Sequence, residues 1–94
     1  MYGLIAKLTL HPGKREEAIA LLTESSRNMP GCFSYVIAAD AKDENVLWVT
    51  EVWESCASHD ASLTLRAVQA AIPKMKALLA NFEKVAETEP IVPA

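Results

Sequence analysis

The stretch VLWVTEVWES, residues 46–55, constrains the fold of this chain more than any other segment. Its density of β-branched and aromatic residues is typical of a strand. Successive side chains of a strand point to opposite faces, yet here both faces are apolar. One face carries Trp48 and two valines, and the other carries Trp53, Glu51 and two further aliphatic side chains. A strand of this kind must be covered on both sides.

The rest of the chain is predicted to form three more strands and three helices. We expect strands over residues 2–10, 32–40 and 83–90, where apolar residues alternate or cluster between turn signals. We expect helices over residues 14–27 and 66–81, and a short helix that begins at Ser55 as N-cap and ends near residue 63. Pro73 should kink or break the long helix, and the last strand should lie at a sheet edge.

The order of these elements is strand, helix, strand, strand, helix, strand, which is the split β-α-β arrangement of ferredoxin-like folds. We therefore predict an α+β fold, βαββαβ, whose antiparallel sheet carries both long helices on one face. The 94 residues make one domain, residues 1–94, with a thin core. Because 51% of the residues are hydrophobic, we expect a second copy to cover the bare sheet face in a homodimer, with Trp48 in the interface.

Composition and motifs argue against several classes of function. The net charge is −3 and the basic residues are scattered, so nucleic acid is not an expected partner. No apolar run is long enough for a membrane span, and no secretory signal pattern is visible, which favours a cytoplasmic protein. Cys32 and Cys56 lack metal-ligand spacing from each other and from the histidines. We expect free thiols, no metal site and no cofactor.

Three segments together resemble the antibiotic biosynthesis monooxygenase (ABM) family: LTLHPGKREEAIALL, MPGCFSYVIAAD and VLWVTEVWES. Their order and spacing match the family from about residue 3 to residue 90. The resemblance implies a dimeric α+β barrel, in which two ferredoxin-like protomers join through their sheet faces. It also implies a ligand site between helices and sheet, where some members oxidise quinols or polyphenols with O₂ and use neither metal nor flavin.

Two residues near the end of the third strand are candidates for catalysis. The resemblance places Trp53 at a recurring position of the site, where its ring would stack on an aromatic substrate; the alternative is a core or interface tryptophan. His59 follows in the short helix. It could accept a phenolic proton, because histidine exchanges protons near neutral pH, or it could be a half-exposed histidine on an amphipathic helix.

Three further residues are candidates for substrate binding. Glu51 could act as a base or hold a substrate hydroxyl in a mostly apolar cleft; the alternative is an ion pair with Lys7 on the neighbouring first strand. Tyr35, expected on the same strand face as Phe33, could hydrogen-bond a ligand or be only a half-buried strand tyrosine. Arg66 could bind a phenolate oxygen or lie in solvent.

These residues lead to two functional hypotheses on one fold. The first is an oxidoreductase, a cofactor-independent monooxygenase that oxidises a quinol or polyphenolic substrate with O₂. The second is a protein that binds or isomerises a small molecule, as in signal-molecule processing, without a need for O₂. A structural or regulatory dimer without a pocket would result if side chains filled the space beside Trp53.

Overall fold

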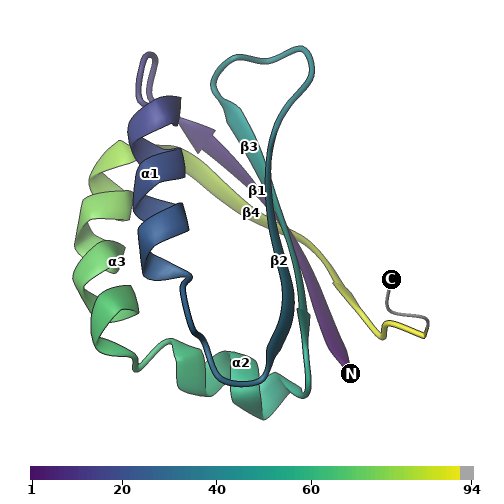
Figure 1. The fold of residues 1–94 in the computed structure, drawn as a ribbon. Helices are drawn as coiled ribbons and strands as arrows, with labels where there is room; N and C mark the ends of the chain where they lie inside the picture. The colour runs from purple at the N-terminus through teal and green to yellow at the C-terminus, as the bar shows by residue number, and fades with distance from the viewer. Residues whose placement is uncertain (92–94) are drawn as a thin grey trace.

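The computed structural model describes residues 1–91, which form one four-stranded sheet and three helices (Figure 1). The strands are β1 (Tyr2–Leu10), β2 (Cys32–Ala39), β3 (Val46–Trp53) and β4 (Leu79–Thr88). The helices are α1 (Arg15–Ser25), α2 (Cys56–Ser62) and α3 (Arg66–Leu78). Residues 92–94 of the predicted domain lie outside the described part. Within that part, no helix combines the length and the apolar character that a membrane-spanning segment needs.

The sheet is antiparallel, with the strand order β2-β3-β1-β4. β1 and β3 occupy its centre, and β4 lies at an edge, as the sequence predicts. α1 and α3 pack against each other on one side of the sheet, while α2 lies at the lower end in Figure 1 and connects β3 to α3. The predicted ferredoxin-like α+β fold is confirmed.

The helix-facing side of the sheet supplies the core. Buried side chains alternate along the two central strands, as expected where one face is covered: Leu4, Ala6, Leu8, Leu10, Leu47, Val49 and Trp53. Ala18 of α1 is completely buried against this layer, and its small side chain allows the helix to approach the sheet closely. Each fully buried leucine contributes about 1.5–3 kcal/mol, so the central strands hold the helices in place.

The opposite face of the sheet is not covered by the described helices (Figure 1). Trp48 is half-buried on this face; its Nε1–H donates a hydrogen bond to Asp40 Oδ1 at 2.8 Å, and Lys7 Nζ lies 5.7 Å from the centre of its ring. Val36 of β2 is 51% exposed and is the Cα partner of Thr50. The two apolar faces of β3 thus divide into a core face and a face that the protomer leaves open.

The boundary between α3 and β4 differs from the prediction. The helix ends at Leu78 rather than near residue 81, and β4 begins at Leu79 without a loop. The Leu79 N–H still closes the last helical turn on the Met75 carbonyl, while its backbone is extended and pairs with Leu10 of β1. Pairing with β1 therefore overrides the helical pattern of the sequence. Of the kink or break predicted at Pro73, the break does not occur, since α3 continues through this exposed position.

A bulge in β2 changes which residue faces the end of β3. The register shifts between Cys32 and Ser34, so Cys32 lies opposite Trp53. Phe33, which simple alternation places with Tyr35, occupies the extra position and is 60% exposed. Bulges are common at sheet edges, but the alternation in the sequence gives no sign that one extra residue is inserted here.

Gly31 joins the start of β2 to the segment that carries α2. Its carbonyl accepts a hydrogen bond from the Glu54 N–H at 2.8 Å, and its φ of 80° lies in the left-handed region that favours glycine. A Cβ at this position would lie 2.7 Å from Ser58 Oγ and 2.8 Å from Ser58 Cβ. The close approach fixes the position of α2 beside the end of the sheet.

We predict that Gly31→Ala destabilises the protein more than Gly13→Ala does. Gly13 also has a left-handed φ, 79°, but a Cβ there would meet nothing within 4 Å. Gly13→Ala should therefore cost only the backbone term, about 1–2 kcal/mol, whereas Gly31→Ala adds the clash with Ser58. Urea unfolding of both variants measures the difference in the free energy of unfolding. Equal losses in the free energy of unfolding would show that α2 moves away from position 31 at no measurable cost.

Candidate functional site

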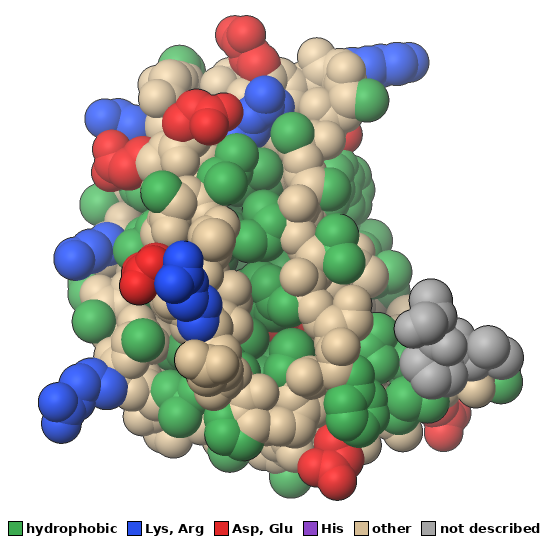
Figure 2. Space-filling view, in the orientation of Figure 1, with side chains coloured by type: hydrophobic (Ala, Val, Ile, Leu, Met, Phe, Trp, Pro, Cys, Tyr) green, Lys and Arg blue, Asp and Glu red, His purple; other side chains and the backbone are tan. Residues whose placement is uncertain are grey.

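A cavity of about 400 Å³ lies between α3 and the helix-facing side of the sheet. A second cavity of about 160 Å³ extends it toward α1, and Leu22, Tyr35, Glu51 and Met75 line both. Figure 2 shows hydrophobic side chains gathered in the hollow between the helices and the sheet. The space has the size and the mostly apolar lining of a small-molecule site, so side chains do not fill it.

Glu51 is the carboxylate in the wall of this cavity. The residue is 8% exposed, and its Oε1 accepts a hydrogen bond from Trp53 Nε1–H at 2.8 Å. Burial raises the pKa of Glu51 above its ordinary value, while the hydrogen bond from Trp53 and the proximity of His59 partly oppose the rise. A carboxylate with a raised pKa is a better proton acceptor than a solvated one, which suits it to general-base chemistry.

Tyr35 stands beside Glu51 on the neighbouring strand. The two residues are Cα partners across β2 and β3, and both line the two cavities. Burial, followed by the nearby Glu51 charge, raises the pKa of the Tyr35 hydroxyl. The hydroxyl therefore remains protonated at neutral pH and can donate a hydrogen bond to a ligand oxygen in the cavity. Strand register thus places Glu51 and Tyr35, both predicted to bind substrate, side by side in one cavity wall.

Trp53 and His59 lie behind Glu51 and line neither of these two cavities. Trp53 is 1% exposed, and its ring meets the His59 ring edge-on, with 5.5 Å between the centroids. The indole is thus connected to the cavity wall through its hydrogen bond to Glu51. Trp53 therefore orients the carboxylate, and His59 packs against Trp53.

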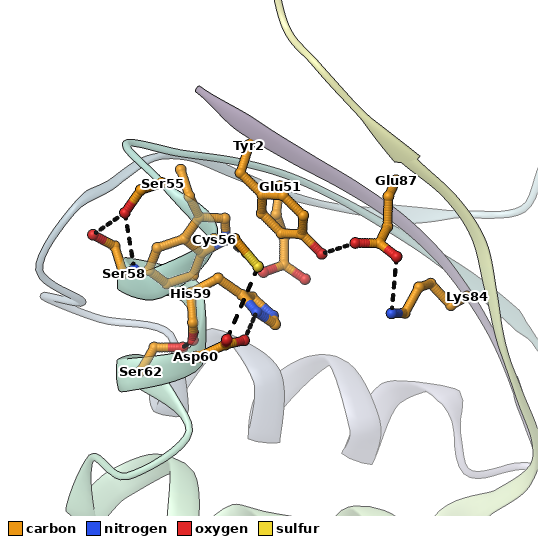
Figure 3. Close-up of polar contacts among 11 residues, drawn as sticks. Tyr2, Glu51, Ser55, Cys56, Ser58, His59, Asp60, Ser62, Lys84 and Glu87 are labelled. Atoms are coloured by element: carbon orange, nitrogen blue, oxygen red, sulfur yellow. Dashed lines mark hydrogen bonds and ion pairs between the residues drawn. The ribbon is translucent and has the colours of Figure 1, made fainter.

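Polar and aromatic contacts lie on two sides of His59 at the end of the sheet (Figure 3). The Tyr2 and His59 rings lie 5.5 Å apart, and His59 Nδ1 lies 3.2 Å from Asp60 Oδ1. The Tyr2 hydroxyl donates to Glu87 Oε2 at 2.9 Å, and Lys84 Nζ lies 3.3 Å from Glu87 Oε1. Burial and the Glu87 carboxylate raise the pKa of Tyr2 to about 12. Through Tyr2, the contacts connect β1 to β4 and to the histidine of α2.

Two sequence expectations for charged residues need revision. The predicted ion pair between Glu51 and Lys7 is wrong, because the register of β1 and β3 pairs Glu51 with Leu4 and Lys7 with Trp48. Lys7 therefore lies on the opposite face, over the Trp48 ring. Arg66 is the first residue of α3 and lines neither cavity. The structure does not bring it to Glu51 and Tyr35.

The sequence did not reveal two residues that matter for the site. Tyr2 is the Cα partner of Trp53, so pairing the predicted first and third strands end to end would have found it. Lys76 lines the larger cavity, but its place on a helix beside apolar positions gave no distinctive signal. Within residues 1–91, no group of three or more His, Cys, Asp or Glu side chains could hold a metal ion, and both cysteines are free.

Comparison with known proteins agrees with this architecture. The sequence profile of the antibiotic biosynthesis monooxygenase family matches residues 1–74. The chain belongs to this family. A solved structure of a candidate antibiotic biosynthesis monooxygenase from Chloroflexus aurantiacus J-10-fl is 47% identical in sequence, with a TM-score of 0.95 over 99% of this chain and 95% of that chain. Comparison with curated proteins finds no match.

Two more distant solved structures share the same fold. A Pseudomonas aeruginosa protein is 22% identical, with a TM-score of 0.84 over 97% of this chain and 94% of that chain. A Mycobacterium tuberculosis protein is also 22% identical, with a TM-score of 0.81 over 99% of this chain and 97% of that chain. At this level of identity the similarity shows the fold alone, so the ABM fold persists while most side chains change.

We predict that Trp53→Phe raises the pKa of Glu51 further. The substitution removes the Nε1–H donor that stabilises the ionised carboxylate, and a lost hydrogen bond to the charged form shifts the equilibrium toward the protonated form. Carboxyl-selective NMR titration of Glu51 measures the change. Trp48→Phe is the matched control, because it removes the donor to Asp40 on the other sheet face. An unchanged pKa of Glu51 in Trp53→Phe would show that the Trp53 Nε1–H does not stabilise the ionised carboxylate.

Proposed function

We propose that the protein is a monooxygenase that oxidises a quinol or polyphenolic substrate with O₂, without a metal or an organic cofactor. The observation that carries the proposal is a buried carboxylate, Glu51, whose pKa is raised in the wall of an otherwise apolar cavity. Membership of the ABM family and the 47% identity to the Chloroflexus aurantiacus protein support an oxygenase assignment.

The reaction balances without an external reductant. A quinol that has a free ring C–H reacts with one O₂ to give a hydroxyquinone and one water. One oxygen atom of O₂ enters the ring, and the other leaves as water. All four electrons come from the substrate. The reaction starts when the phenol loses a proton, because an electron-rich phenolate can pass one electron directly to O₂. The protein must then supply a base, a donor for the substrate oxygen, and a site that excludes water.

The residues of the cavity suit these roles. Glu51 accepts the phenolic proton, and Tyr35 donates a hydrogen bond to the second oxygen of the substrate. Trp53 holds the Glu51 carboxylate in position from behind through its Nε1–H, which makes it a positioning residue, and the His59 ring packs against the Trp53 ring. The apolar walls contributed by β1 and α3, including Ala6, exclude water from the reacting oxygen species.

Oxygen uptake by metal-stripped protein with a panel of reduced naphthoquinones tests this function. We expect uptake above the spontaneous rate, and a 10²–10⁴-fold lower kcat in Glu51→Gln, the range for loss of a general base. Glu16→Gln is the control, because this exposed carboxylate lies in the first turn of α1 and lines neither cavity. No uptake with any quinol would refute the oxygenase, and turnover that persists without O₂ would favour an isomerase on the same scaffold.

We also infer that the protein forms a homodimer through the open sheet face. Trp48 is only half-buried there, and Val36, the Cα partner of Thr50 on β3, is 51% exposed. An open face with exposed apolar side chains is typical of a surface that a partner covers. A second copy in an isologous arrangement would place each protomer's bare face on the other, as the resemblance to dimeric α+β barrels implies.

We predict that Val36→Glu dissociates this dimer, because a carboxylate would be buried without a partner in the interface. Sedimentation velocity at micromolar protein should give the mass of two chains for the wild type and of one chain for the variant. Val36→Thr, which keeps the side-chain shape, serves as the control and should remain dimeric. A monomeric wild type would refute the inferred interface.

A further inference from the structure

The two charged side chains in the cavity lining lie in different parts of it. Among the described residues that line the larger cavity and its extension, Glu51 has the one acidic side chain and Lys76 the one basic side chain. The remaining side chains are uncharged. A cavity with one carboxylate and one ammonium distinguishes the two ends of a ligand. The separation of these groups therefore bears on what kind of molecule fits.

Strand register places the two charges at opposite ends. Glu51 is the Cα partner of Leu4, whereas Phe82 is the partner of Leu8. Four residues of strand separate these levels, which is about 13 Å. Lys76 precedes Leu79 by roughly one helical turn, and Leu79 is paired still further along β1, with Leu10. Lys76 thus belongs to the end marked by Leu8 and Phe82.

Lys76 is available to a ligand. It is exposed, and it forms no ion pair with any acidic group of residues 1–91. Its neighbour Lys74 lies on the same helix but lines grooves between α1 and α3 on the outside of the helix layer. The two lysines therefore differ in which cavity they face, although they share the helix and the charge.

We propose that the substrate is an elongated quinol or polyphenol that carries a carboxylate, or a comparable anionic group, at the end opposite the reacting ring, and that Lys76 binds this anion. The proposal deepens the proposed function, on which it rests. The oxygens of the reacting ring lie at Glu51 and Tyr35, and the anion lies at the mouth beside Phe82, which is 55% exposed.

Electrostatics determines the orientation. An anionic group beside Glu51 would meet a like charge in an apolar wall, whereas the same group beside Lys76 meets an opposite charge at a solvated opening. The reversed binding mode is disfavoured at both ends. Lys76 is thus a specificity-determining residue that selects which end of the substrate enters first, so that the oxidisable ring reaches the base.

Isothermal titration calorimetry with three non-oxidisable hydroxynaphthoates tests the proposal without the oxygen reaction. 6-Hydroxy-2-naphthoate has its hydroxyl and carboxylate at opposite ends of the rings, its methyl ester lacks the charge, and 3-hydroxy-2-naphthoate places the two groups side by side. We expect the wild type to bind the first compound about two- to fivefold more tightly than either of the others, the scale of an exposed ion pair. High salt should remove this preference.

Lys76→Gln should abolish the preference, and Lys74→Gln should retain it. A preference that survives in Lys76→Gln, a wild type that favours the ester or the side-by-side isomer, or no binding of any of the three compounds would overturn the proposal. The outcome is separable from the proposed function. Selective binding without oxygen uptake would leave Lys76 as an anion site and refute the oxygenase, whereas uptake with neutral quinols alone would retain the oxygenase and refute the role of Lys76.

Discussion

The hydrogen bond from Trp53 Nε1 to Glu51 Oε1 is the interaction on which the candidate site depends. A carboxylate taken out of water needs a donor, since an unpaired buried polar group destabilises the folded state. The indole supplies that donor from the same strand, two residues away and on the same face. The raised pKa of Glu51 shows that the compensation is partial. The remaining cost of burial is what suits the carboxylate to the proposed role of base.

Much of the fold follows from the sequence because its apolar pattern is strong. The two apolar faces of β3 were visible in VLWVTEVWES, and the structure assigns the face of Trp53 to the core and that of Trp48 to the open side. The α3–β4 boundary could not be predicted, because the helical pattern continues past Leu78 and only pairing with β1 ends it. Local patterns record burial, whereas the boundary is decided by a contact between distant segments.

The site was partly predictable for a related reason. Glu51 and Tyr35 were recognised as candidates from their strand faces, and register makes them neighbours. An ion pair with Lys7 is compatible with the adjacency of β1 and β3 but not with their register, which places Lys7 on the other face. Lys76 escaped notice because a lysine beside apolar helix positions is indistinguishable in sequence from a solvent-facing one. Its significance depends on a cavity, and a cavity has no sequence pattern.

The direct passage from α3 into β4 has a mechanical consequence. The Leu78 carbonyl accepts the His11 N–H at 2.9 Å, and the next residue already pairs with Leu10, so two consecutive residues clamp this end of the helix to the end of β1. The helix cannot swing outward here without unzipping an edge strand. Adjustment to ligands of different girth must therefore occur at the other end, where Leu63 borders the cavity in the short connection between α2 and α3. The clamped end of the helix is also the end that carries Lys76.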